Sequence, residues 1–128
     1  MFIEKLKEIA DRVGSARVVS LLAEDGIPVE THGSLDEGGE FSSDGGRQVD
    51  LEALAAELLA QVRTIGENHR ELKMGEVDQF SVSTESYTAI VGRLAPGYFL
   101  LMVLAAKAGL GRARFELRRA PLLFEGDL

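Results

Sequence analysis

Residues Tyr98–Ala106, YFLLMVLAA, form an unbroken apolar run. Successive side chains of a β-strand point to opposite faces, so a strand of this composition has to be covered on both faces. The run is too short to cross a bilayer, because a membrane-spanning helix needs about 20 apolar residues. We therefore expect a central strand, with helices packed on each side of its sheet.

Two further strands are predicted directly before this run. Residues Val77–Thr84 alternate between apolar and polar side chains, and Tyr87–Leu94 is largely apolar. The intervening residues, Glu85-Ser86 and Ala95–Gly97, are typical of tight turns. Three consecutive strands joined by tight turns must pair antiparallel.

The N-terminal part predicts a helix followed by a hairpin. Apolar residues at helical spacing indicate a helix over 2–13, and Arg17–Ala23 is a short apolar strand. Asp25-Gly26 between two apolar runs is a strong hairpin signal, with Ile27–Thr31 as the returning strand. Pro28 cannot donate a ladder hydrogen bond, so we expect this strand at a sheet edge.

The remaining segments complete an α+β pattern. Residues 32–48 are rich in Gly, Ser and acidic residues and predict a long loop, with an extra stretch of strand around Phe41. Helices are expected over 50–73 and over 109–120, the latter ended by Pro121. The order helix, two strands, helix, three strands, helix (α-β-β-α-β-β-β-α) predicts a five-stranded, mostly antiparallel sheet with helices on both faces. The length fits a single domain over residues 1–128.

The helix predicted over 50–73 has two different faces. Asp50 is a suitable N-cap. The face expected to pack on the sheet carries Leu51, Leu54, Leu58, Val62 and Ile65. The opposite side carries Ala53, Ala56 and Ala60, flanked by Glu57, Arg63 and Thr64. Two interpretations remain open: the alanines are simple helix-forming filler, or they form a smooth surface that another backbone approaches closely.

The strand over 77–84 begins the three-strand unit, so we expect it at the other sheet edge. It carries no Lys and no Pro, the residues that usually protect an edge. Such an edge favours pairing with a second copy in a two-fold dimer, which would also set the two 50–73 helices side by side. The expected dimer residues are Gln79, Phe80, Ser81, Val82 and Ser83.

Composition excludes several classes of function. A formal net charge of −7 and a pI near 4.8 disfavour binding to nucleic acid or to an anionic membrane. There are no cysteines, and charges interrupt the N-terminal residues, so we expect a cytoplasmic protein with no disulfide and no membrane span.

No catalytic or cofactor motif is present. His32 and His69 lack any neighbour at metal-ligand spacing, and Gly109-Leu110-Gly111 is followed by Arg114 where a dinucleotide loop needs glycine. We therefore expect neither a cofactor nor a metal, and a binding module rather than an enzyme. An arginine cluster at Arg112, Arg114, Arg118 and Arg119 has two interpretations: a solvated helix face, or contact with an acidic partner.

The order and spacing of several segments resemble the Roadblock/dynein light-chain family. The resemblance is carried by Asp25–Val29, by the alanine-rich helix that opens at Leu51, and by Leu101–Leu104 followed by Gly109-Leu110-Gly111. It implies a homodimer with a continuous sheet and paired long helices. It also implies binding to Ras-like small GTPases, or a role as a dimeric scaffold. Bacterial members stimulate a GTPase as dimers by rearranging its switch region, without an arginine finger.

Two functional hypotheses follow from the resemblance. The first is a dimer that binds a Ras-like GTPase and modulates its nucleotide hydrolysis. The second is a structural adaptor that has no effect on nucleotide turnover. Carried over by position, the partner-binding residues are Ala53, Ala56, Glu57, Ala60, Arg63 and Thr64.

Overall fold

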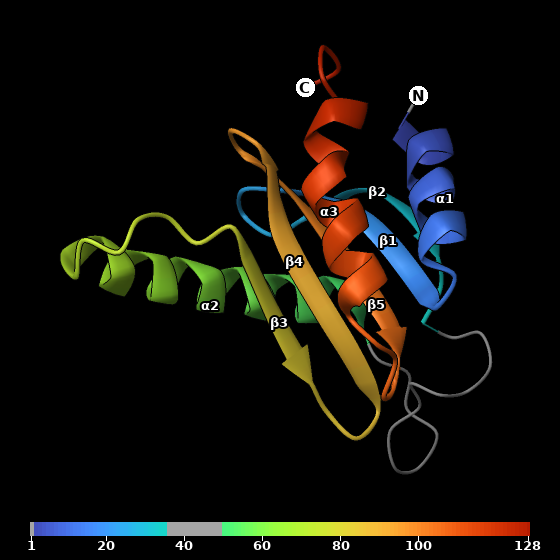
Figure 1. Ribbon diagram of the computed structural model, residues 1–128, viewed down its shortest axis with the longest axis horizontal. Coiled ribbons are helices and arrows are strands. Elements are labelled where there is room, and N and C mark those ends of the chain that lie inside the picture. The colour runs from blue at the N-terminus through green and yellow to red at the C-terminus, as the bar shows by residue number, and fades with distance from the viewer. Residues whose placement is uncertain (1, 36–49) are drawn as a thin grey trace.

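The structure is a computed structural model that describes residues 2–35 and 50–128. The described residues form three helices and five strands in the predicted order (Figure 1). The elements are α1 (Phe2–Val13), β1 (Ala16–Ala23), β2 (Pro28–Gly33), α2 (Leu51–Glu71), β3 (Gln79–Ser83), β4 (Tyr87–Ala95), β5 (Tyr98–Ala105) and α3 (Gly111–Leu123).

The strands form one sheet in the order β2-β1-β5-β4-β3, and every pairing is antiparallel. The apolar strand β5 lies at the centre, between β1 and β4, as its composition predicts. β2 and β3 are the two edges, which confirms both edge predictions. Pro28 therefore opens a strand that pairs on one side only.

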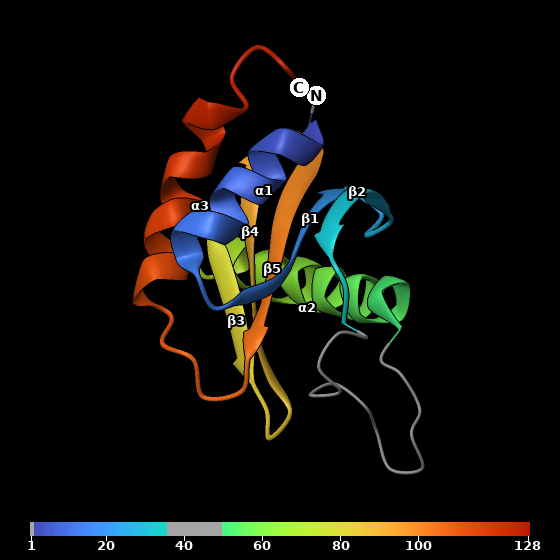
Figure 2. The same cartoon turned by 90° about the vertical axis from the view of Figure 1, so that its right-hand side faces the viewer.

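Helices cover both faces of the sheet. α2 crosses one face, and α1 and α3 lie side by side on the other (Figures 1 and 2). Alternate residues of β5 divide between the two layers: Leu100, Met102 and Leu104 pack under α1 and α3, whereas Leu101 and Val103 pack under α2. The predicted fold class is confirmed, because both faces of the central strand are buried beneath helices.

The β1–β2 hairpin turns at Asp25-Gly26, as predicted. Gly26 has a φ of +89°, which side-chain-bearing residues rarely adopt, and its N–H donates to the Ala23 carbonyl (2.9 Å). The Asp25 carboxylate accepts from the Ile27 N–H at 3.0 Å. The conformation of the turn thus favours glycine at position 26 and a short acceptor side chain at position 25.

Two expectations about segment ends are wrong. α3 does not end at Pro121 but continues to Leu123 with Pro121 inside it. A proline near the end of a helix removes only one hydrogen bond, and the Phe124 N–H still donates to the Ala120 carbonyl (3.1 Å). Phe124 is buried with its ring 6.0 Å from that of Phe2, which favours continuing the helix.

β2 extends to Gly33, so the predicted loop over 32–48 loses its first two residues to the strand. The strand expected around Phe41 lies outside the described residues. Among the helices that the structure describes, none is sufficiently long and apolar to span a membrane.

Candidate partner-binding surface

α2 packs on the sheet through a face slightly different from the predicted one. Leu58 and Val62 are buried as expected, whereas three other predicted core residues, Leu51, Leu54 and Ile65, are only half-buried. Ala55 and Leu59, which the sequence analysis did not select, are fully buried. The helix is rotated so that Ala55 rather than Leu54 faces inward.

The tip of the β1–β2 hairpin lies directly against α2, at the helix turn that carries Ala55 and Ala56. A Cβ atom built on Gly26 would lie 3.1 Å from the Cα of Ala56 and 3.4 Å from the carbonyl oxygen of Ala55. Only small residues on both sides permit this backbone-to-backbone approach. The backbone of α2 at Ala55 and Ala56 therefore packs against the tip of the β1–β2 hairpin.

The predicted partner-binding residues share one exposed face of α2, which we call the α2 platform. All of them are exposed: Ala53, Ala56, Glu57, Ala60, Arg63 and Thr64. The polar members are tied within the helix: Thr64 Oγ1 donates to the Ala60 carbonyl (3.1 Å), and Gln61 Nε2 donates to the Glu57 carboxylate (3.2 Å). The α2 platform thus has short alanine side chains at Ala53, Ala56 and Ala60, with the longer Glu57 and Arg63 beside them.

The edge strand β3 exposes backbone groups in a defined pattern. The Arg93 N–H donates to the Asp78 carbonyl at 3.2 Å, which sets the phase of the β3–β4 ladder. Alternate residues of an antiparallel strand bond to the same neighbour. The backbone groups of Phe80 and Val82 therefore point to β4, and those of Gln79, Ser81 and Ser83 face the open edge.

The side chains of β3 alternate between the two faces of the sheet. Phe80 and Val82 extend the core cluster beneath α2 but remain half-buried. On the opposite face, Gln79 Nε2 donates to the Arg114 carbonyl of α3 at 3.4 Å. The apolar layer under α2 therefore reaches the open edge without being closed there.

The C-terminal part of α2 projects beyond β3 (Figure 1). Its inner face continues past Val62 as Ile65 and His69, both half-buried. Just beyond the helix, Leu72 and Met74 are 69% and 70% exposed. Apolar surface from α2 and from β3 thus meets at the same edge of the molecule.

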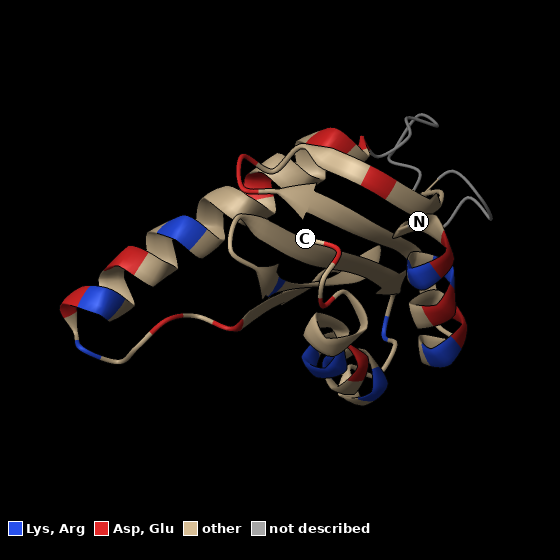
Figure 3. Ribbon diagram, turned by 90° about the horizontal axis from the view of Figure 1, so that it is seen from above, with Lys and Arg blue, Asp and Glu red and all other residues tan. Residues whose placement is uncertain are grey.

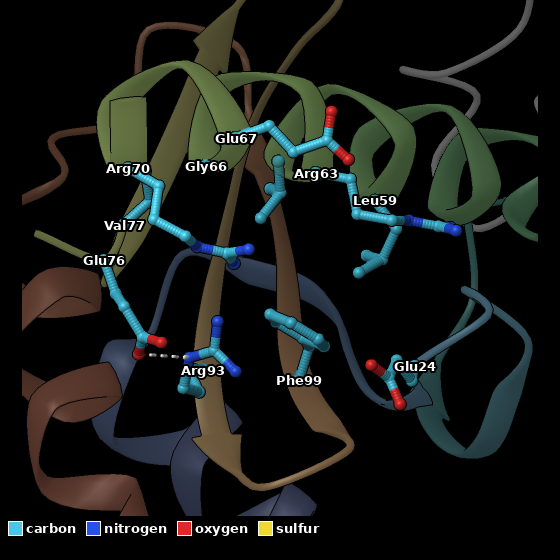
Figure 4. Close-up of a pocket in the computed structure, with 11 residues that line it drawn as sticks. Glu24, Leu59, Arg63, Gly66, Glu67, Arg70, Glu76, Val77, Arg93 and Phe99 are labelled. Carbon is cyan, nitrogen blue, oxygen red and sulfur yellow. Dashed lines mark ion pairs between the residues drawn. The ribbon is translucent and has the colours of Figure 1, made fainter. Parts of the chain in front are cut away.

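A charged pocket of about 210 Å³ lies beside the α2 platform, between α2 and the ends of β4 and β5 (Figure 4). Buried Leu59, Val62 and Phe99 line it. Arg70 reaches into it from α2 and Arg93 from β4. The Arg93 guanidinium carbon lies 5.2 Å from the Phe99 ring centroid, and its Nε is 3.9 Å from the Glu76 carboxylate.

Of the residues that line this pocket, only Arg63 is among the predicted partner-binding residues. Arg93 carries the one signal that could have been used, since it is a single charge within the apolar strand YTAIVGRLA. Arg70 lies in the last turn of α2, where a cation is common because it complements the helix dipole. Their convergence depends on how α2 crosses the sheet, which is not a local property.

Neither histidine belongs to a metal-binding group. His32 lies on β2, and the Nδ1 of His69 contacts the Ile65 carbonyl at 2.9 Å, within its own helix. Over residues 2–35 and 50–128, no cluster of potential metal-ligating side chains occurs.

Several solved structures share this fold. MglB from Myxococcus xanthus matches with a TM-score of 0.74 and 15% identity over 96% of this chain and 94% of that one. A Roadblock/LC7 domain from Streptomyces avermitilis matches with a TM-score of 0.75 and 17% identity over 95% and 92%. MglC from Myxococcus xanthus matches with a TM-score of 0.64 and 28% identity over 99% and 98%. Neither a protein-family model nor a curated protein sequence matches the chain.

The chain therefore has the Roadblock/LC7 fold, over nearly its whole length and with low sequence identity. Profilin IA of Acanthamoeba castellanii shares the fold as well, with a TM-score of 0.57 and 13% identity over 99% of this chain and 98% of that one.

Proposed function

We propose that this chain forms a homodimer that binds a Ras-like small GTPase on its α2 platform and modulates nucleotide hydrolysis by that GTPase. The observation that carries the proposal is the shared edge of β3 and α2, where backbone hydrogen-bonding groups and apolar side chains are left open together. The class of partner comes from the resemblance of the sequence to Roadblock proteins and from the MglB-like fold.

A second copy of the chain would pair with the open backbone groups of this edge and would also cover its apolar side chains. Antiparallel pairing of two β3 strands would use the outward backbone groups of Gln79, Ser81 and Ser83. The same two-fold axis would bring the overhanging end of each α2 towards the partner subunit, covering Leu72 and the half-buried Phe80. An interface in which one patch meets its own copy is the usual form of a two-fold dimer.

The α2 platform suits close docking of a folded partner. Its centre is made of alanine side chains, so a partner backbone can approach without displacing long side chains. Glu57 and Arg63 at its margins offer one charge of each sign, which would fix the orientation of the partner more than its affinity. Dimerisation places two such platforms on the same side of the joined sheet.

Regulation follows if the α2 platform prefers one nucleotide state of the GTPase. A ligand shifts a two-state equilibrium only by its differential affinity for the two states. Preference for the triphosphate-bound switch conformation would hold the catalytic groups of the GTPase itself in place. We assign no residue of this chain to the reacting phosphate.

Phosphate release by a Ras-like GTPase from the same organism tests the proposal. We expect faster release when this protein is added, tighter binding of the GTPase loaded with a non-hydrolysable GTP analogue than with GDP, and loss of both effects in Ala60→Arg. Absence of binding in either nucleotide state contradicts the proposal.

A dimeric adaptor is the second candidate. The chain is 28% identical to MglC and 15% identical to MglB, and the two proteins share one fold. The fold alone therefore does not favour the regulator over the adaptor. Binding to the GTPase that is equal in both nucleotide states, with unchanged phosphate release, would identify the adaptor.

A further inference from the structure

The outward side of α3 is basic in an otherwise acidic chain. Four arginines are exposed on this helix, whereas the whole chain has a formal net charge of −7. They are Arg112, Arg114, Arg118 and Arg119. The one carboxylate of the helix, Glu116, is 4% exposed and pairs with Arg119 at 3.5 Å. The ribbon of α3 carries several positions of Lys or Arg, whereas the β1–β2 hairpin carries positions of Asp or Glu (Figure 3).

Two large apolar side chains share this side of the helix. Phe115 is 49% exposed and Leu122 is 74% exposed. They are seven residues apart, so they lie on the same stripe of the helix. Arg119 lies between them, with its guanidinium carbon 5.6 Å from the centroid of the Phe115 ring. Arginine and exposed aromatic residues are the types enriched at the centres of protein interfaces.

Surface hollows flank this stripe on both sides. One is lined by Leu94, Leu117 and Pro121, with Arg118 at its margin. The other lies between α1 and α3 and is lined by Ile9, Ala120 and Leu123, with Arg119 at its margin. Each hollow also contains two carboxylates and two guanidinium groups: Glu76, Asp78, Arg93 and Arg118 in the first, and Glu8, Glu116, Arg12 and Arg119 in the second. The excess of positive charge therefore lies on the helix between the hollows, at Arg112 and Arg114, and the hollows themselves offer apolar side chains among balanced charges.

We infer that this surface, the α3 ridge, binds an acidic amphipathic segment of another protein. Its apolar side chains would enter the hollows, and its carboxylates would pair with the arginines. The α3 ridge comprises Arg112, Arg114, Phe115, Arg118, Arg119 and Leu122.

The charge distribution favours an acidic polypeptide over a polyanion. DNA, RNA and anionic membranes carry many negative charges close together, so a chain of net charge −7 is repelled by them more than by a short acidic segment. A short acidic segment interacts mainly within the Debye length of about 8 Å at physiological salt, where the local arginines dominate. Exposed Phe115 and Leu122 further require apolar groups in the partner.

The α3 ridge lies across the sheet from the α2 platform (Figure 2). Binding at the α3 ridge therefore does not depend on the proposed GTPase binding at the α2 platform. One partner can occupy each surface at the same time. A protein with two such faces would connect two partners through one rigid sheet.

Fluorescence anisotropy with a labelled synthetic peptide tests the inference. The probe is a helix-forming peptide of about 15 residues, long enough to be marginally helical alone, with Glu on one face and Leu and Phe on the other. We expect binding at about 0.15 M salt that weakens as salt increases. The double variant Arg112→Glu, Arg118→Glu is expected to weaken it about tenfold or more, equivalent to about 1.4 kcal/mol.

Matched controls separate the α3 ridge from net charge. Arg70→Glu with Lys73→Glu makes the same change of charge at the far end of α2 and should leave peptide binding within about twofold. Phe115→Ser should weaken binding without any change of charge. A scrambled peptide of identical composition should bind at least about tenfold more weakly, because it has no apolar face.

Three results overturn the inference. The first is no binding of the patterned peptide. The second is an equal loss of binding in the α3 and α2 double variants. The third is that single-stranded DNA or anionic vesicles bind in an α3-dependent manner more tightly than the peptide does. Circular dichroism of each variant establishes that its fold is intact.

Discussion

Gly26 at the tip of the β1–β2 hairpin lies against the backbone of Ala56 in α2. A Cβ at position 26 would be 3.1 Å from the Cα of Ala56, which is closer than about nine in ten real Cβ contacts. This approach ties the hairpin to the helix that carries the proposed partner surface. At the same helix turn, Ala55 faces the sheet and is fully buried.

The first prediction is that Gly26→Ala destabilises the fold more than a comparable glycine substitution elsewhere. Gly97 has a similar φ (+82°) but open space around the position of its Cβ. Gly97→Ala should cost about 1 kcal/mol for the backbone conformation alone, and Gly26→Ala should cost about 2–3 kcal/mol because it also pushes against Ala56. Urea unfolding measures both variants. Equal losses would show that the contact with Ala56 has no energetic consequence.

The second prediction is that Leu59 contributes more to stability than Leu54, because α2 turns Leu59 towards the sheet. Leu59 is 1% exposed, so Leu59→Ala should lower the free energy of unfolding by about 2–5 kcal/mol through lost burial and a cavity. Leu54 is half-buried, so Leu54→Ala should cost about 1 kcal/mol. Thermal or urea unfolding of the two variants provides the comparison. A larger loss for Leu54 would mean that the helix packs as the sequence pattern suggests instead.

A third prediction concerns the α2 platform. Ala60→Arg should abolish GTPase binding, since a long charged side chain then occupies the centre of the contact, and it should leave the mass of the dimer unchanged. Asn68→Arg adds the same side chain to exposed surface of α2 about two turns further along, outside the platform, and should bind the GTPase nearly as the parent does. Isothermal titration with the GTPase in its triphosphate form measures both. Normal binding by Ala60→Arg would place the partner elsewhere.

A fourth prediction concerns the overhanging end of α2. Leu72 is exposed in a single chain, so Leu72→Ser should change the stability of a monomer by less than about 0.5 kcal/mol. In the proposed dimer Leu72 is covered by the partner subunit, and the same change should weaken association about tenfold. Sedimentation over a range of concentrations measures the effect, with Glu71→Gln as a control on the same turn. An unchanged dissociation constant would exclude this part of α2 from the interface.

The order of elements follows from local patterns. The apolar run at Tyr98–Ala106 requires a doubly covered strand, Asp25-Gly26 sets the hairpin, and short turns force Val77–Ala106 into an antiparallel unit. Each of these signals depends on residues close together in the chain, so periodicity and turn chemistry were enough to predict them.

What the sequence did not reveal depends on tertiary packing. The burial of Ala55 accompanies a contact with Gly26, about thirty positions earlier in the chain, and helical periodicity within α2 cannot predict a contact with a distant segment. The convergence of Arg70 with Arg93 likewise depends on the angle at which α2 crosses the sheet. Pro121 lies within α3, and the burial of the Phe124 side chain beyond it favours continuing the helix.

The most direct measurement of the central claim is the mass of the protein in solution with and without an open β3 edge. Ser81→Pro removes an outward N–H while sparing the bonds to β4, and Ser81→Ala retains that N–H. Sedimentation equilibrium should give twice the chain mass of 13.9 kDa for the parent and for Ser81→Ala, and the single-chain mass for Ser81→Pro. A monomeric parent, or a dimer that Ser81→Pro leaves intact, would contradict the account.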